Sequence, residues 1–117
     1  MHTPDEVLKR LRMYSLSLPE SSEVQSWGHP NFRAGRKTFA VFEYYQGIPS
    51  IAIRIDAAEK ESLLSDPRFY RTPYAGNRGW ISIRIDRRVS WDLIQDLVLK
   101  SYRIVALKKM IKLLEID

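Results

Sequence analysis

The sequence predicts a single soluble α+β domain over residues 1–117, and three observations carry that prediction. Apolar residues recur at helical spacing near both ends of the chain, whereas apolar and polar residues alternate in between. Short segments containing Gly, Pro and Asn separate the alternating stretches, as between strands of hairpins. A hydrophobic fraction of 44% and an aromatic fraction of 11% supply enough apolar surface for a core and exclude a disordered chain.

The first helix is expected over residues 4–18. Thr3 can cap it, Pro4 suits the first helical position, and Glu6 completes a Thr-x-x-Glu capping box. Pro19 ends it, because the residue before a proline is disfavoured in the helical conformation. The apolar stripe between these signals predicts an amphipathic helix lying on a sheet.

Alternation with a period of two from residue 23 to residue 55 predicts strands. The clearest is the stretch 51–55, which places three isoleucines on one face and Ala52 and Arg54 on the other. Earlier strands are expected at residues 31–34 and 38–44, and tight turns at residues 35–37 and 46–49.

Capping residues predict where the helices of the second half of the chain begin. Asp56 with Glu59 predicts the start of a short helix, and Ser90 predicts the start of the last helical region. The expected elements are a helix at 56–64, an extended stretch at 69–74, a turn at 75–79, a strand at 80–85 and a helical region at 91–114. The length and broad apolar face of the last region suggest a bend or two helices.

One short internal echo links the two halves. Residues 51–56 read Ile-Ala-Ile-Arg-Ile-Asp, and residues 81–86 read Ile-Ser-Ile-Arg-Ile-Asp. A duplicated strand–helix unit would explain the echo, and so would two core strands that obey the same patterning rules. The second explanation is favoured, because strand patterns are loose and six residues make a short repeat.

Charge is distributed unevenly along the chain. Residues 1–66 hold 8 Lys/Arg and 9 Asp/Glu, a balance of −1, whereas residues 67–117 hold 11 and 5, a balance of +6. A one-sided positive field raises the local concentration of polyanions. A solvated basic helix surface would give the same count, so the charge alone leaves both explanations open.

Composition also sets limits on location. No apolar run reaches the ~20 residues that a transmembrane helix needs, and residues 1–6 are polar and acidic, unlike a signal peptide. The absence of Cys excludes disulfides, thiolate nucleophiles and Cys-ligated zinc, and it is compatible with a reducing compartment. We therefore expect a cytoplasmic protein with no membrane partner.

Residue types that carry catalytic chemistry are few or scattered. The two histidines, His2 and His29, have no further ligand at metal-binding spacing. No pair of acidic residues stands out as an acid–base couple, and neither a Gly-x-Ser-x-Gly elbow nor a Gly-rich phosphate loop occurs. The sequence therefore predicts a binding protein rather than an enzyme, with no catalytic residues, no metal and no cofactor.

Basic side chains gather at two predicted hairpin turns. A two-stranded ribbon fits the major groove of DNA, and long cations at its tip can follow phosphates. Exposed turns also attract Lys and Arg for solvation alone, so a single basic turn would decide nothing. Two such turns, further arginines and a lysine-rich last helix favour a polyanion. We predict DNA as the partner, contacted by Arg33, Arg36, Lys37, Arg71, Asn77, Arg78, Arg84, Arg87 and Arg88.

The alternative is a small-molecule or protein-interaction module without catalysis. Its pocket would lie near Trp27, His29, Tyr74 and Trp80, since Trp27 and Tyr74 both flank turns. Most large aromatics belong to a core, and that is the expected place of the others.

Several short blocks, taken in order, resemble a known family. The opening block is Trp-Gly-His-Pro-x-Phe-Arg at residues 27–33, followed by Lys-x-Phe-Ala at 37–40. Later blocks are Asp-Pro-Arg-Phe-Tyr at 66–70, Gly-Trp-Ile at 79–81, Trp-Asp-Leu at 91–93 and Ser-Tyr-Arg-x-Val-Ala at 101–106. On these motifs the chain is identified as a member of the MmcQ/YjbR family of small bacterial proteins, over nearly its whole length.

The resemblance implies a compact CyaY-like fold, a twisted antiparallel sheet packed against N-terminal and C-terminal helices. Family members are described as DNA-binding through a double wing of two β-ribbons, which the two basic turns would match. Members often carry Pro at the position of Leu107, so the family comparison favours a continuous last helix here. The frataxin-like alternative, metal delivery, needs an acidic first helix, whereas Lys9, Arg10 and Arg12 lie there.

Overall fold

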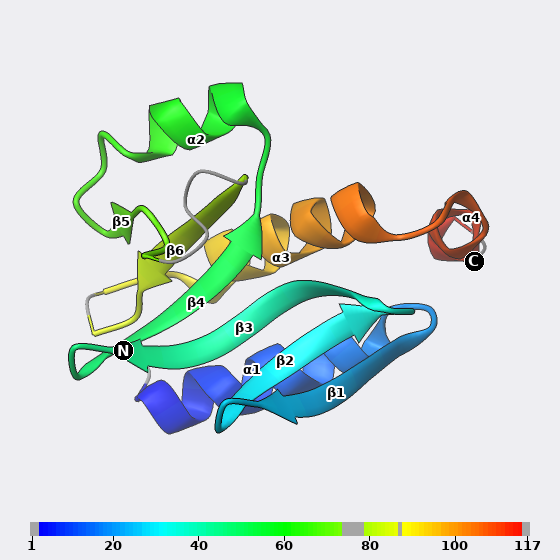
Figure 1. Cartoon of the computed structure of the whole chain (residues 1–117), viewed down its shortest axis with the longest axis horizontal. Helices are drawn as coiled ribbons and strands as arrows, with labels where there is room; N and C mark the ends of the chain where they lie inside the picture. The colour runs from blue at the N-terminus through cyan, green and yellow to red at the C-terminus, as the bar shows by residue number, and fades with distance from the viewer. Residues whose placement is uncertain (1–2, 74–78, 87, 116–117) are drawn as a thin grey trace.

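The fold is a six-stranded antiparallel sheet with helices packed against it (Figure 1). The computed structural model describes residues 3–73, 79–86 and 88–115. In chain order the elements are α1 (Pro4–Ser17), β1 (Ser21–Ser26), β2 (His29–Ala34), β3 (Lys37–Tyr45), β4 (Ile48–Arg54), α2 (Ala57–Leu63), β5 (Phe69–Tyr70), β6 (Trp80–Arg84), α3 (Trp91–Val105) and α4 (Lys108–Leu114). The strand order is β1-β2-β3-β4-β6-β5. The predicted α+β class, with helices from both ends of the chain on an antiparallel sheet, is confirmed.

The first helix begins and ends where its capping signals predict. The backbone N–H of Glu6 donates to Oγ1 of Thr3 at 3.2 Å, and α1 closes at Ser17. Arg12 ties the helix to β1, because its Nε and Nη2 donate to the carboxylate of Glu23 at 2.7 and 2.9 Å. That bidentate contact holds the pKa of Glu23 below its ordinary value.

Alternation along the strands divides the sheet into two faces. Buried residues such as Phe32, Phe42 and Ile53 lie on the face that packs against α1 and α3, and both helices pass behind the sheet in Figure 1. We call the opposite side the open face. Cross-strand register places on it His29, Asn31, Arg33, Thr38, Val41, Glu43, Ser50, Ala52, Arg54, Trp80, Ser82 and Arg84.

A bulge in β3 is fixed by the helix behind it. Phe32 pairs with Ala40 whereas Arg33 pairs with Thr38, so β3 carries one extra residue at Phe39. The fully buried hydroxyl of Ser101 in α3 donates to the carbonyl of Phe39 at 2.6 Å and accepts from the N–H of Arg54 at 2.8 Å. One side chain therefore satisfies two backbone groups that the bulge removes from the ladder.

The two halves of the sequence echo are adjacent strands. β4 and β6 pair antiparallel, with Ile51 opposite Ile83 and Ile53 opposite Ile81. All four isoleucines are buried in the core. A shared position on one apolar face accounts for the repeated Ile-x-Ile pattern through cross-strand packing, in agreement with the favoured explanation.

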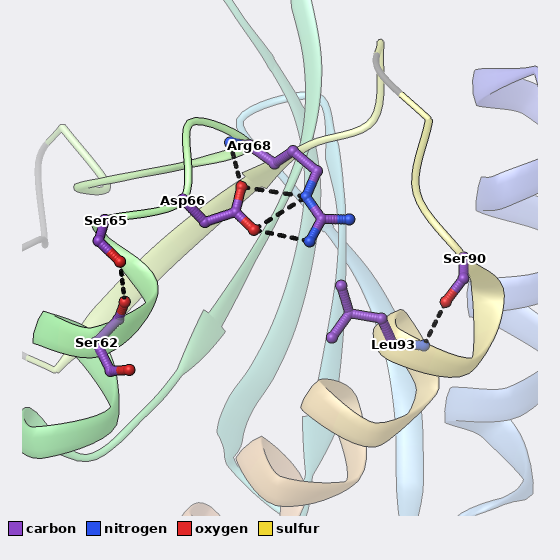
Figure 2. A network of polar contacts seen from close by, with 6 residues as sticks. All are labelled: Ser62, Ser65, Asp66, Arg68, Ser90 and Leu93. Carbon is purple, nitrogen blue, oxygen red and sulfur yellow. Dashed lines mark hydrogen bonds and ion pairs between the residues drawn. The ribbon is translucent and has the colours of Figure 1, made fainter.

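The connection from α2 to the edge strand is held by local polar contacts (Figure 2). The carboxylate of Asp66 accepts from the backbone N–H of Arg68 at 2.9 Å and from Nη2 of the same residue at 2.7 Å. These hydrogen bonds hold the pKa of Asp66 below its ordinary value. The predicted extended stretch at 69–74 is wrong in extent: only Phe69–Tyr70 pairs with β6, because Thr72 turns its hydroxyl onto Ser82 at 2.9 Å.

The last helical region is two helices, which confirms the expectation from its length and broad apolar face. The continuous helix that the family resemblance favoured is wrong. α3 begins at the predicted cap, where Ser90 accepts from the N–H of Leu93 at 3.1 Å (Figure 2). It ends at Val105, and the next two residues, Ala106 and Leu107, are extended, with ψ values of 149° and 155°. No proline is needed for this break. The change of direction allows Met110 in α4 to be buried, close to Gly35 in the β2–β3 turn.

Candidate functional site

A cavity of about 440 Å³ opens on the open face. Its lining comes from the β1–β2 hairpin, the centre of the sheet and the segment near β6: Ser26, Trp27, His29, Asn31, Thr38, Val41, Glu43, Ala52, Thr72 and Trp80. The volume lies within the range of roughly 300–1,000 Å³ that is usual for small-ligand sites. Three of the four residues of the predicted pocket, namely Trp27, His29 and Trp80, line this one cavity.

Trp27, at the edge of the cavity, has a left-handed backbone conformation and an exposed indole, and both are unfavourable for the stability of the fold. It occupies the β1–β2 turn with Gly28 at φ values of 55° and 78°, the left-handed geometry in which Asn-Gly is usual. Its side chain is 95% exposed. The β3–β4 turn has the same geometry at Gln46 and Gly47, with φ values of 52° and 80°, but there the exposed side chain is polar. A strained, exposed tryptophan is a departure from local rules of the kind that marks functional sites.

The floor of the cavity is the centre of the sheet. Val41 pairs with both Asn31 and Ala52, and all three line the cavity. Glu43 lies two residues further along β3 and is only 5% exposed. Continuing the β2–β3 register by two residues brings His29 level with Glu43. The cavity floor therefore combines the apolar side chains of Val41 and Ala52 with the amide of Asn31, and it has a buried carboxyl group and an imidazole at one end.

The open face also carries three arginines, one each from β2, β4 and β6: Arg33, Arg54 and Arg84. Their Nε atoms are buried, and none has a hydrogen-bond partner among the described residues. The guanidinium of Arg54 lies 5.8 Å from the ring centroid of Trp80, a cation–π contact beside the cavity. Buried donors without partners are uncommon, and an anionic ligand would satisfy them.

A second cationic cluster lies at one end of the sheet, and we call it the basic end. It consists of Arg36 and Lys37 at the β2–β3 turn with three lysines of α4, namely Lys108, Lys109 and Lys112. A Cβ atom built on Gly35 would lie 3.0 Å from the Cε of Met110, so α4 packs directly against this turn. All five cations are exposed, and none forms an ion pair within the described part of the chain.

The turn of the first predicted ribbon and the start of β6, in the second, lie at the same end of the sheet. Lys37 begins β3, and Trp80 begins β6 opposite Arg54, the last residue of β4. Since β3 and β4 are antiparallel, both positions lie at the same end of the strands. The tip of the second ribbon, with the predicted site residues Tyr74, Asn77 and Arg78, lies outside the described residues, as does Arg87.

The remaining predicted cations lie apart from the basic end. Arg71 pairs with Glu61 at 3.3 Å. Arg84 ends β6 and Arg88 follows it, so both lie at the opposite end of that strand from the predicted tip. Arg84 and Arg88, which the sequence counted as further arginines outside the two turns, therefore lie away from both predicted ribbon tips. The structure brings together Arg33, Arg36 and Lys37.

Sequence reasoning missed the residues that complete the cavity, among them Asn31, Thr38 and Glu43. Alternation places each on a face of its own strand, but only the strand order makes those faces one surface. The sequence also counted Lys100 with the basic last helix. Its ammonium donates to Glu59 at 3.2 Å and lies 3.4 Å from Asp96, contacts that raise the pKa of Lys100.

Among the described residues, no group of three or more His, Asp or Glu side chains is arranged to hold a metal ion. In the same part of the chain, every helix is too short or too polar to cross a bilayer.

Comparisons with known proteins address the fold and the family. The family model described as YjbR matches residues 16–104. No curated protein matches the chain. The crystal structure of Deinococcus radiodurans protein DR2400, family-model domain DUF419, is similar with a TM-score of 0.78 at 20% identity, covering 100% of this chain and 94% of that one. A protein from Pseudomonas syringae is similar with a TM-score of 0.69 at 14% identity, covering 89% and 98%. At these identities, the two likenesses establish a shared fold.

Proposed function

The chain belongs to the YjbR family, and we propose that it binds DNA through phosphate contacts at the basic end. One observation carries the proposal: the packing of Met110 beside Gly35 places α4, with its three exposed lysines, next to the turn that carries Arg36 and Lys37. The lysines are remote from the turn in sequence, so the fold itself produces the cluster. The proposal assigns the protein no reaction.

The charge of this end is strongly positive even when nearby acids are included. Glu20 lies beside the turn, since its carbonyl accepts from the N–H of Gly35 at 3.1 Å, and Glu115 caps α4. Five cations against these two carboxylates leave a balance of +3. Exposed cations without carboxylate partners are available for phosphates, and binding would release the counterions of the nucleic acid.

The arginines of the open face extend the proposed contact surface. Arg33 is two residues before Gly35 and faces the same side of the sheet as Arg54. Both have buried Nε atoms without hydrogen-bond partners in the described structure. A phosphate at the edge of the open face would supply the missing acceptors through charge-assisted hydrogen bonds.

The proposal is tested by titrating a fluorescently labelled duplex at several salt concentrations. The wild type is compared with the double variant Arg36→Ala/Lys37→Ala. A matched control, Lys9→Ala/Arg10→Ala, removes the same charge from α1, which packs on the other face of the sheet.

If both tip residues contact phosphates, their double variant lowers the slope of log affinity against log salt by about 1.8, because each duplex phosphate contact contributes about 0.9. The loss should be similar for unrelated duplex sequences. The control should retain most of the wild-type slope. If the two double variants lost equal amounts of affinity, only the net charge of the protein would matter and the basic end would not be the contact surface. A duplex affinity that does not change with salt concentration would also refute the proposal.

A second candidate function is a small-molecule or protein-interaction module at the cavity, and one observation favours it. Trp27 and His29 from one hairpin and Trp80 from a distant strand line the same concave site. An equilibrium dialysis screen of labelled metabolites against wild type and Trp27→Asn distinguishes this candidate. A ligand that binds equally well at high salt and competes with no duplex would favour it over DNA.

A further inference from the structure

We propose that the cavity of the open face binds a small aromatic acid, in which one ring is joined to one carboxylate by a short linker. The ring would lie on the apolar part of the floor beside Trp27, and the carboxylate would bind between Arg33 and Arg54. The inference rests on the second candidate function, because it names the class of ligand for the same cavity. The cluster at the basic end takes no part in it.

Three donors lie in one row of cross-strand neighbours on the open face, at the edge nearest the basic end. Thr38 on β3 pairs with Arg33 on β2. On the other side of β3, Arg54 is level with Phe39, because the hydroxyl of Ser101 hydrogen-bonds to both backbones. The strands β2, β3 and β4 lie side by side (Figure 1), so the two arginines flank Thr38 from strands roughly 10 Å apart. An anion above Thr38 is therefore within reach of both long side chains.

Both arginines have a buried N–H group that lacks an acceptor. The Nε atoms of Arg33 and Arg54 have no hydrogen-bond partner in the described part of the chain, and neither side chain forms an ion pair there. The guanidinium of Arg54 is held at the rim of the cavity, because it lies 5.8 Å from the ring centroid of the lining residue Trp80. A carboxylate would satisfy these donors through charge-assisted hydrogen bonds.

The floor and one wall of the cavity suit a flat apolar group. Val41 and Ala52 pair across β3 and β4 and form part of the floor. Trp27 lines the same cavity with 95% of its side chain exposed, so a ligand can cover a face of the indole. An aromatic ring placed there gains stacked or edge-to-face contacts that a saturated ring of similar size lacks. The apolar part of the ligand is therefore expected to be aromatic.

The spacing between floor and arginines determines the length of the ligand. Val41 pairs with Asn31, and Thr38 pairs with Arg33 two residues further along β2, so ring and carboxylate would lie in neighbouring rows roughly 7 Å apart. A ring joined to its carboxylate by a short flexible linker, as in phenylpropionate, spans such a step. Glu43 lies beyond Val41 in the opposite direction along β3. The carboxylate of the ligand would therefore bind on the far side of the ring from Glu43 and needs no contact with it.

The first experiment compares three probes of similar size by isothermal titration calorimetry with the wild type. Phenylpropionate carries both the ring and the charge, phenylpropionamide lacks the charge, and cyclohexylpropionate lacks the aromatic ring. Phenylpropionate should bind about tenfold more tightly than the amide, because only a carboxylate makes charge-assisted hydrogen bonds to both arginines. It should bind roughly fivefold more tightly than the cyclohexyl acid, in line with the energy of aromatic pairs.

Two pairs of variants assign these preferences to the cavity. Arg54→Gln should weaken the binding of phenylpropionate about tenfold, whereas its control Arg36→Gln removes the same charge from the exposed turn and should leave most of the affinity. Trp27→Asn should remove the preference for phenylpropionate over the cyclohexyl acid. Its control Gln46→Asn, in a turn of the same geometry, should retain that preference. Circular dichroism checks the fold of all four variants, and the comparison of probes on the wild type does not depend on any of them.

The outcomes separate this inference from the candidate function on which it rests. An amide that binds as tightly as the acid, with both affinities reduced in Trp27→Asn, would show a site for small rings without a preference for acids. That result would overturn the inference and keep the candidate function. Equal losses of phenylpropionate affinity in Arg54→Gln and Arg36→Gln would overturn the inference, because the acid would then respond only to net charge. If none of the three probes bound, the inference would also fail, and the metabolite screen with Trp27→Asn would decide the candidate function separately.

Discussion

Replacing Trp27 by Asn should increase the stability of the protein, which is the reverse of what losing a tryptophan normally does. The left-handed backbone at Trp27, with φ 55°, costs a residue with a bulky side chain about 1–2 kcal/mol, whereas Asn adopts this conformation more readily. Asn followed by Gly is also the preferred pair for this hairpin turn. Relief of part of the strain should raise the free energy of unfolding by about 0.5–1 kcal/mol.

The packing lost with the indole is small by comparison. Since the side chain is 95% exposed, it buries about one-twentieth of the ~250 Å² that a core tryptophan buries. That area is about 12 Å², and at about 25 cal/mol per Å² it contributes about 0.3 kcal/mol. The strain term is therefore the larger of the two. A fully buried tryptophan would instead cost about 3–5 kcal/mol on truncation.

Chemical denaturation of wild type and Trp27→Asn measures the difference, and the midpoint of thermal unfolding should rise by about 3 °C. Gln46→Asn is the matched control, because Gln46 occupies the same turn geometry with φ 52° and an exposed side chain. It should shift stability in the same direction. A loss of more than about 1 kcal/mol in Trp27→Asn would refute the reasoning, since it would show that the indole packs in the native state.

Three further substitutions test the packing and electrostatics of the fold. Ser101→Ala leaves the carbonyl of Phe39 and the N–H of Arg54 without their partner, so the free energy of unfolding should fall by about 1–3 kcal/mol in urea titrations; an unchanged midpoint would contradict this. Glu23→Gln should cost about 0.5–1 kcal/mol at neutral pH, after allowance for solvent screening at the 41% exposed Arg12. Because the folded pKa of Glu23 is lowered, this stabilisation is full above the unfolded pKa and disappears as pH falls through the folded pKa, so melting curves near pH 2 should coincide. Gly35→Ala should lower stability by about 1 kcal/mol or more, since φ is +61° and the new methyl would lie 3.0 Å from Met110; a more stable variant would show that α4 does not rest on this turn.

The helices and strands could be predicted because their signals are local. Thr3, Asp56 and Ser90 each accept the backbone hydrogen bond that their positions predicted. Alternation located β4 and β6 to within a few residues. Such signals depend on neighbours in the chain, which the sequence displays directly.

Features that depend on distant contacts could not be predicted. The length and apolar face of residues 91–114 indicated a bend or two helices, but no local signal placed the break at Leu107, which allows Met110 to pack beside Gly35. The family comparison pointed the other way, because it relied on a missing proline. Likewise, the short length of β5 follows from the contact between Thr72 and Ser82. Tertiary packing therefore determines both the position of the break between the last two helices and the length of β5.

The candidate site likewise has parts that local sequence signals predicted and parts that depend on distant contacts. Arg36 and Lys37 could be recognised at a turn from sequence, and Trp27 and His29 could be recognised as a local motif. The association of the turn with α4 depends on the break after α3. The association of Trp27 and His29 with Trp80 depends on the strand order, which assembles residues from five segments of the chain around one cavity. The site is therefore a product of topology more than of any single motif.

Nuclear magnetic resonance of the isotope-labelled protein tests the central claim most directly, because it locates a duplex on the surface residue by residue. A duplex is added stepwise at moderate salt, and backbone amide shifts are followed along the chain. The largest changes should fall at the basic end, at Arg36, Lys37 and the lysines of α4, and they should diminish as salt is raised. Changes confined to the outer surfaces of α1 and α3, or no changes at all, would contradict the claim that the protein binds DNA through this end.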